Sequence, residues 1–123
     1  MDYKKIDPAL GLMKDFSRVT NGMPALLDQM RKKAIFSEGA VAPKFKVLAA
    51  MIWSISSRCE PCFKYYVQQA TKYGVTEAEL GEFLAVASTM GGCVGEMWAL
   101  KAYRAFKDPD HQSEDENGGH CCT

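Results

Sequence analysis

The stretch PKFKVLAAMIWSISSRCEPCFKYYVQQATKYG, residues 43–74, decides the fold. Pro43 suits the first turn of a helix, where its missing N–H costs nothing, and Gly74 is a natural residue to follow a helix end. Apolar side chains recur at helical spacing in both halves: Val47, Leu48, Met51, Ile52 and Ile55 in the first, and Cys59, Cys62, Phe63, Tyr66, Val67 and Ala70 in the second. The stretch therefore predicts two amphipathic helices, the second of which begins at a pair of cysteines.

The upstream sequence predicts two further helices. A short one lies within 7–19, the chain breaks around Asn21-Gly22, and a second helix runs from about Pro24 to Phe36. The apolar residues at helical spacing are Leu10, Met13 and Phe16 in the first and Leu27, Met30 and Ala34 in the second. Residues 37–42 are expected to form a loop.

The downstream sequence contains the sharpest helix start in the chain. Thr76-Glu77-Ala78-Glu79 matches a capping box, with Thr76 at the N-cap and Glu79 at N3. Gly91-Gly92 is expected to end that helix, and a final one to run from about Cys93 to Phe106. The sum is an all-α, single-domain bundle of five to six helices over residues 1–107, followed by an acidic tail at 108–123 that we expect to be disordered.

Composition and charge exclude several classes of protein. The chain has 123 residues, 47% of them hydrophobic, as is ordinary for one globular domain. The N-terminal residues lack the apolar core of a secretory signal, and the longest apolar stretch, 47–55, is far below the roughly 20 residues that span a bilayer. All 15 Lys and Arg residues lie in 1–107, without the basic stripe typical of a nucleic-acid interface. We expect a cytoplasmic protein that binds neither membrane nor nucleic acid.

Cys59 and Cys62 carry the most specific chemical signal. Cysteines three apart at a helix start have Cα atoms close enough for a disulfide, and the helix dipole favours a thiolate there. Arg58 and Lys64 add positive charge nearby. In a reducing compartment such a pair is more typical of catalysis, redox sensing or metal binding than of a structural bridge. Tyr66, one turn beyond Cys62, is a candidate hydrogen-bond partner or proton donor for a sulfur, although a tyrosine on such a face also packs the core.

Two other interpretations of the cysteine pair stay open. In the first, the pair supplies two of the four ligands of a zinc site and two further ligands come from elsewhere. In the second, the two cysteines are packed in the core and have no chemical role. The remaining candidate ligands are Cys93, His111, His120, Cys121 and Cys122. Because they form no second CxxC at the usual spacing, and four of them lie in the tail, the redox interpretation leads, with no metal and no cofactor expected.

The order and spacing of several segments give the chain a family resemblance over roughly residues 35–106. These segments are Glu38-Gly39-Ala40, Pro43 to Ala50, Ser57-Arg58-Cys59-Glu60-Pro61-Cys62, Ala70 with Gly74-Val75-Thr76, and Met90-Gly91-Gly92. Together they resemble the AhpD-like/carboxymuconolactone decarboxylase family. The resemblance implies a helical bundle that assembles into a homo-oligomer, often a trimer or hexamer. In the AhpD branch it also implies a thiol-dependent peroxidase or disulfide reductase.

The chain departs from the AhpD branch at two positions. That branch has a Glu twelve residues before the first cysteine and a His four residues after the second, and these positions are Val47 and Tyr66 here. Only Cys59 and Cys62 are carried over residue by residue. Glu60, Glu82 and Glu96 are the carboxylates considered as replacements, each more typical of a surface charge.

Two functional hypotheses follow from these residues. In the first, the chain is an enzyme that reduces a peroxide or disulfide by cycling Cys59 and Cys62 between thiols and a bridge, with a thiol reductant restoring it. In the second, the same pair switches a non-enzymatic redox sensor or interaction protein. The missing Glu and His favour the second hypothesis.

Overall fold

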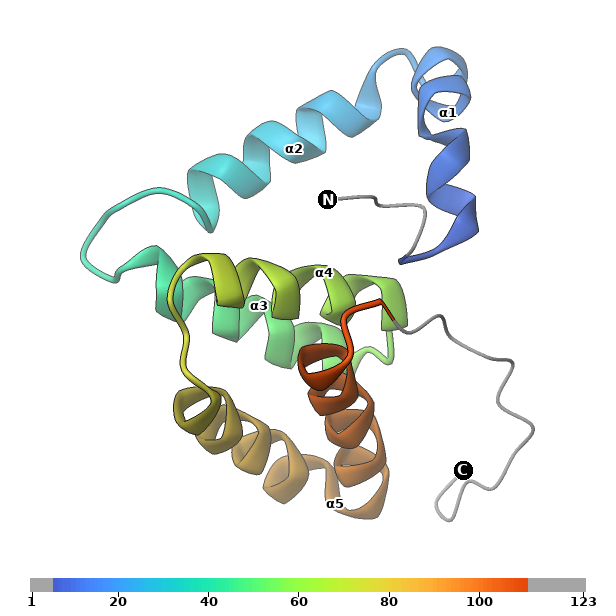
Figure 1. Ribbon diagram of the computed structural model, residues 1–123. Helices are drawn as coiled ribbons and strands as arrows, with labels where there is room; N and C mark the ends of the chain where they lie inside the picture. The colour runs from blue at the N-terminus through green and yellow to red at the C-terminus, as the bar shows by residue number, and fades with distance from the viewer. Residues whose placement is uncertain (1–5, 111–123) are drawn as a thin grey trace.

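The computed structural model describes residues 6–110, and over that range every regular element is a helix (Figure 1). The elements are the 3₁₀ turn η2 (Pro8–Leu12), α1 (Met13–Val19), α2 (Met23–Ala34), α3 (Pro43–Ser56), α4 (Glu60–Lys72) and α5 (Glu77–Lys107). The predicted all-α fold is confirmed. Most of the expected acidic tail, with His111, His120, Cys121 and Cys122, lies outside the described residues.

The core is formed by α3, α4 and α5, each of which packs against the other two. The largest fully buried side chains are Val47, Leu48, Met51, Phe63, Val67 and Leu80. All of them except Leu80 belong to the apolar residues whose helical spacing was noted in residues 43–74. The core therefore fixes the junction between α3 and α4, where the cysteine pair lies.

The N-terminal helices differ from their prediction in two ways. The expected helix at 7–19 begins as the 3₁₀ turn η2, because the Asp7 side chain accepts a hydrogen bond from the Ala9 N–H (2.8 Å) and caps a tight first turn. The helix predicted to reach Phe36 ends at Ala34. Phe36 leaves the helix to stack on Tyr73, with ring centroids 5.8 Å apart. No residue of η2, α1 or α2 is buried, although each of the two predicted helices carries apolar residues at helical spacing.

The predicted capping box at the start of α5 is confirmed, with both of its hydrogen bonds present. The Thr76 hydroxyl accepts from the Glu79 N–H (3.1 Å), and the Glu79 carboxylate accepts from the Thr76 N–H (2.9 Å). Lys44, in the first turn of α3, pairs with Glu79 at 2.8 Å. That contact, followed by the hydrogen bond to Thr76, lowers the pKa of Glu79 below its ordinary value. This group of contacts ties the starts of α3 and α5 together.

The two ends of α5 are also fastened to each other. The Tyr103 hydroxyl donates to the Glu77 carboxylate at 2.5 Å, and Lys107 lies 3.7 Å from the same oxygen. The hydrogen bond from Tyr103 and then the charge of Lys107 lower the pKa of Glu77, and Glu77 in turn raises the pKa of Tyr103. Residues near the start and the end of α5 are thus held side by side.

A kink at Gly92 makes this contact possible by dividing α5 into two halves, 77–91 and 93–107 (Figure 1). Gly92 has φ 62° and ψ −145°, a combination that is essentially restricted to glycine. The predicted break at Gly91-Gly92 is confirmed, although the second half follows without a loop. Among the described residues, α5 alone is long and apolar enough to cross a membrane. The kink leaves each half shorter than the roughly 20 residues that a span needs.

Candidate functional site

The turn between α3 and α4 holds Cys59 in place through its backbone. The Arg58 N–H donates to the Ile55 carbonyl (3.0 Å) and the Cys59 N–H donates to the Ser54 carbonyl (2.9 Å). Arg58 has φ 58°, the left-handed conformation that closes a helix in a Schellman motif. Because glycine is the usual residue at this position, the chain accepts some backbone strain immediately before the first cysteine.

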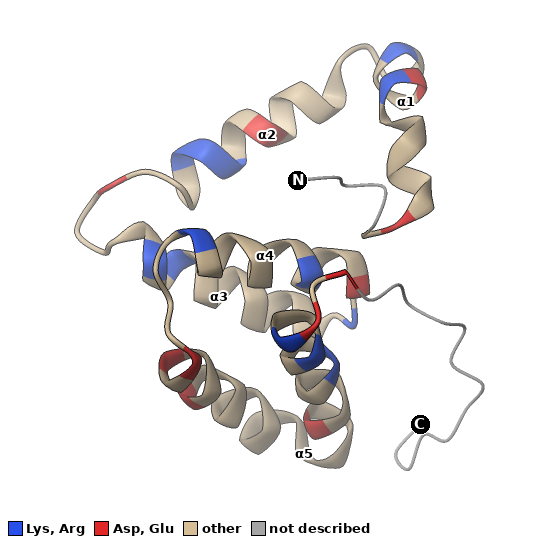
Figure 2. Ribbon diagram, in the orientation of Figure 1, with Lys and Arg blue, Asp and Glu red and all other residues tan. Residues whose placement is uncertain are grey.

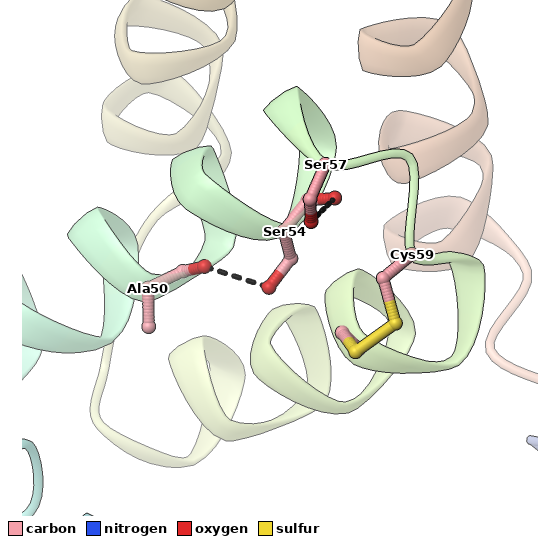
Figure 3. The surroundings of a disulfide bond; sticks show 5 residues. Ala50, Ser54, Ser57 and Cys59 are labelled. Atoms are coloured by element: carbon pink, nitrogen blue, oxygen red, sulfur yellow. Dashed lines mark hydrogen bonds between the residues drawn. A yellow bond between two sulfur atoms is a disulfide. The ribbon is translucent and has the colours of Figure 1, made fainter.

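Cys59 is the N-cap residue of α4, and Cys62 lies in its first turn. The Cys59 carbonyl accepts from the Phe63 N–H at 3.0 Å, so both sides of its backbone are hydrogen-bonded. The two cysteines form a disulfide, with Cα atoms 5.2 Å apart (Figure 3). Both side chains are half-buried. The predicted dithiol is therefore a pair in contact, at a helix start, with limited access to solvent.

Ser54 of α3 and Ser57, the C-cap residue that ends α3, lie near the disulfide (Figure 3) and were not singled out from the sequence. Ser54 is buried, and its hydroxyl donates to the Ala50 carbonyl (2.8 Å). The Ser57 hydroxyl donates to the Ser54 carbonyl (3.2 Å), the same oxygen that receives the Cys59 N–H (Figure 3). The sequence signal that could have identified Ser54 is a serine within an otherwise apolar helix face. These bonds position Cys59 rather than take part in chemistry.

Glu60 and Lys64 place a charged pair next to the disulfide. Their side chains are only 19% and 8% exposed, and Lys64 Nζ lies 3.1 Å from Glu60 Oε2. The alignment is that of an ion pair rather than of a directed hydrogen bond. The interpretation of Glu60 as a surface charge is therefore wrong. The i, i+4 spacing predicts the pair but not its burial.

A shallow hollow borders this pair on one side. It lies between the start of α4 and the end of α5, and the side chains that line it include Glu60, Lys64, Lys101, Arg104 and Asp108. Glu82 and Glu96, the other carboxylates considered, are exposed on α5. Of the three carboxylates considered, Glu60 is thus the one that directly follows a cysteine of the pair and is largely shielded from solvent.

Tyr66 lies on α4 one turn beyond Cys62, as expected from the spacing. It is half-buried and packs against the core, with its ring at a near-right angle to that of Tyr65 and 5.0 Å from it. Val47, at the other position where the AhpD branch has a relay residue, is fully buried in the core. A charged relay side chain at position 47 would not fit this apolar environment.

The part of the chain that the structure describes contains no group of three or more His, Cys, Asp or Glu side chains suited to a metal ion. Of the alternative zinc ligands, Cys93 is described, on α5. The other four lie in the tail beyond residue 110. The zinc interpretation thus finds no ligand set within residues 6–110.

Comparison with known proteins agrees with the geometry. The model of the carboxymuconolactone decarboxylase family matches residues 22–105, which is most of the chain. An uncharacterised protein of Cupriavidus necator is 28% identical over 95 residues, which cover 76% of this chain and 84% of that protein.

A solved structure extends the comparison to three dimensions. The apo crystal structure of a carboxymuconolactone decarboxylase family protein from Legionella pneumophila superposes with a TM-score of 0.78 at 25% sequence identity. The match covers 87% of this chain and 95% of the other. The same arrangement of helices is therefore found in a crystal structure.

Proposed function

Because the chain belongs to the carboxymuconolactone decarboxylase family and joins Cys59 to Cys62 at the start of α4, we propose that it is a thiol–disulfide oxidoreductase or an alkylhydroperoxidase-like peroxidase. The observation that carries the proposal is the cysteine pair itself, half-buried and held by α3 through the Ser54 carbonyl. Its substrates are peroxides or disulfides, and a thiol reductant restores it. The reducing cytoplasm is the compartment that suits this cycle.

The electrostatics of α4 support a reactive thiol in the reduced state. Both cysteines lie at the positive end of the helix dipole, which favours a thiolate over a thiol. The Glu60 carboxylate would oppose ionisation, but Lys64 pairs with it and offsets its charge.

With a peroxide substrate, the cycle transfers two electrons from the cysteines. One thiolate attacks an oxygen of the peroxide, the O–O bond breaks, and the departing alkoxide takes a proton and leaves as an alcohol. The second thiol attacks the resulting sulfenic acid, so that the Cys59–Cys62 bond forms and water leaves. With a disulfide substrate, two successive exchanges release two thiols. In both cases a thiol reductant then supplies two electrons and two protons.

Tyr66 is our candidate for the proton donor in this cycle. Its position one turn after Cys62 on the same face of α4 supports this role. A phenol that donates a hydrogen bond to a departing alkoxide or thiolate lowers the barrier to bond cleavage. Tyr66 would assist proton transfer only, because the two cysteines supply both electrons that reduce the substrate.

Steady-state turnover of the full-length chain tests the proposal. With a dithiol reductant in excess, we expect one or more of hydrogen peroxide, an organic hydroperoxide and a small disulfide to be consumed in many equivalents per chain. The measurement is the loss of substrate against time, with the uncatalysed rate subtracted. If none of the three is consumed beyond one equivalent per chain, the enzymatic proposal is wrong.

A redox sensor is the second candidate, and the residues at positions 47 and 66 favour it. Val47 is buried among apolar side chains and Tyr66 packs on Tyr65, so neither offers the carboxylate or imidazole of the AhpD branch. A sensor would be oxidised once per chain without turnover and would change its association with partners. Sedimentation of the oxidised and reduced forms separates it from the enzyme.

A further inference from the structure

Two ionisable side chains beside the disulfide are shielded from water, and no step of the cycle proposed above uses them. Figure 2 shows charged residues gathered where the start of α4 meets the end of α5. Within this group, Glu60 and Lys64 are largely covered and lie 3.1 Å apart. Arg58, the cation that precedes the first cysteine, is exposed. Of the charges that flank the cysteines in sequence, water therefore screens those of Glu60 and Lys64 least.

The ammonium of Lys64 is fixed close to the cysteine pair. Lys64 lies two residues after Cys62, between the fully buried Phe63 and Val67 of the same helix. Among the described residues its Nζ finds an ion-pair partner in Glu60 but no directed hydrogen bond. At a rise of about 1.5 Å per residue, residues 59–64 span roughly 7.5 Å of helix axis. The charge of Lys64 is therefore on the order of 10 Å from the two sulfurs.

Stability alone does not account for this pair. When two charges are buried together, the cost of removing them from water offsets much of their attraction, so a buried ion pair is weak evidence for a stabilising role. Charges arranged around reactive side chains, by contrast, are a common means of adjusting how those side chains ionise. The position of the pair, at the helix start that carries the proposed chemistry, points to the second role.

The two charges act on a cysteine thiolate in opposite directions. The ammonium of Lys64 stabilises a negative sulfur, and the carboxylate of Glu60 destabilises it. At an effective dielectric constant of about 20, a unit charge about 10 Å away changes an ionisation constant roughly 10-fold. In bulk water the same charge changes it only about twofold. The shielded pair is therefore expected to influence the sulfurs more than the exposed Arg58 does.

The neighbouring helices add few other charges at this point. The last turns of α3 and the turn that follows, residues 47–57, contain no ionisable side chain. The end of α5 brings two cations and one carboxylate to the hollow beside the pair: Lys101, Arg104 and Asp108. Lys101 lies over the ring of Trp98, 5.3 Å from its centroid, and Arg104 and Asp108 are exposed. Because these groups stay the same when Glu60 or Lys64 is replaced, variants of the pair isolate its own effect.

We propose that the Glu60–Lys64 pair sets how readily the reduced Cys59–Cys62 pair ionises, with Lys64 favouring the thiolate and Glu60 limiting it. Ionisation releases the thiol proton to solvent and leaves the sulfur that attacks a peroxide or a disulfide. The inference rests on the proposed function and deepens it, because it concerns the activation of the same sulfurs. Glu60 and Lys64 are positioning residues that act through their charges. The charge missing at the two relay positions of the AhpD branch is thereby supplied from within α4 itself.

The pH dependence of iodoacetamide alkylation of the reduced, full-length chain tests this proposal. Alkylation follows the thiolate, and mass spectrometry measures it on the peptide that contains Cys59 and Cys62, apart from the other cysteines. Lys64→Met removes the ammonium and should raise the midpoint pH by about one unit, a loss of about 10-fold in ionisation. Glu60→Gln should lower the midpoint by a similar amount. The double variant should return to within about twofold of the wild type, because both charges are then absent.

Two controls separate charge from structure. Lys72→Met replaces an exposed lysine in the last turn of the same helix and should titrate like the wild type. Lys64→Arg keeps the charge and should also leave the midpoint unchanged. Circular dichroism checks the helix content of each variant. If Lys64→Met unfolds, the comparison of Glu60→Gln with the double variant measures the Lys64 charge instead, and the same difference of about 10-fold is expected.

Either of two results overturns the proposal. One is a loss of the Lys64 charge that moves the midpoint no further than Lys72→Met does. The other is a shift in the same direction for Lys64→Met and Glu60→Gln, as a loosened helix start would produce. The measurement requires no substrate, so its failure is distinct from that of the proposed function. An active oxidoreductase with an unmoved midpoint would reject only the role of the ion pair.

Discussion

Cys59→Ser and Cys62→Ser are each expected to abolish turnover of the peroxide or disulfide substrate, with a fall of about 10³-fold or more. Serine keeps the size of the side chain but neither ionises near neutral pH nor forms a sulfur–sulfur bond. One variant lacks the attacking sulfur and the other lacks the sulfur that resolves the intermediate. The measurement is steady-state turnover under the conditions used for the wild type.

Cys93→Ser is the matched control for these variants. Cys93 lies in the second half of α5 and is disulfide-bonded outside the Cys59–Cys62 pair. Its replacement should leave turnover within about twofold of the wild type, because the cycle draws its electrons from the pair alone. Circular dichroism should give equal helix content for all three variants. Retained activity in either Cys59→Ser or Cys62→Ser would contradict the two-cysteine mechanism.

Gly92→Ala and Gly95→Ala are each expected to lower the free energy of unfolding by about 2 kcal/mol or more. Gly92 has φ 62° and ψ −145°, which a residue with a Cβ adopts only at high cost. At Gly95 an added Cβ would lie 2.6 Å from the carbonyl oxygen of Ala87. That oxygen belongs to the backbone of the opposing half of α5, so it cannot rotate away.

Gly91→Ala provides a control one residue from the kink. A Cβ at Gly91 meets no atom within 4 Å, and its φ is not in the left-handed range. Alanine there should leave the protein as stable as the wild type or raise its stability by about 0.5–1 kcal/mol, since alanine favours a helix over glycine. Urea unfolding of the three variants measures these differences. Equal stability of Gly92→Ala and Gly91→Ala would show that the kink does not depend on glycine.

Local chemistry explains why much of the fold could be predicted from the sequence. The capping box at Thr76 and Glu79 depends on side chains and amides three residues apart, so the residue types alone specify it. The break at Gly92 likewise follows from one residue type that tolerates an unusual backbone. Pro43 begins α3 as predicted, for the same local reason.

What the sequence could not show is which surfaces meet. The helical spacing of Leu27 and Met30 correctly places them on one face of α2, and the structure leaves that face exposed. Periodicity reports that a surface is apolar, not what covers it. The burial of Glu60 and Lys64 escaped prediction for a similar reason, because it depends on how the end of α5 approaches the start of α4.

The candidate site was predicted where its geometry is local and missed where it is not. Three-residue spacing brings Cys59 and Cys62 together on one turn of α4, and the structure places them there. The role assigned to Tyr66 stays a prediction, tested by Tyr66→Phe against the wild type. Ser54 was missed because its contribution is a carbonyl oxygen, which every residue possesses.

The most direct test of the central claim is a redox titration of the Cys59–Cys62 pair in the full-length protein. The chain is equilibrated across a glutathione series, its free thiols are alkylated, and mass spectrometry measures the fraction in which these two cysteines are bridged. We expect a reversible transition between about −220 and −320 mV, the range set by the cytosolic thiol pool, with two electrons per chain. A pair that stays reduced across the whole series, or that cannot be alkylated because a metal occupies it, would contradict a working dithiol.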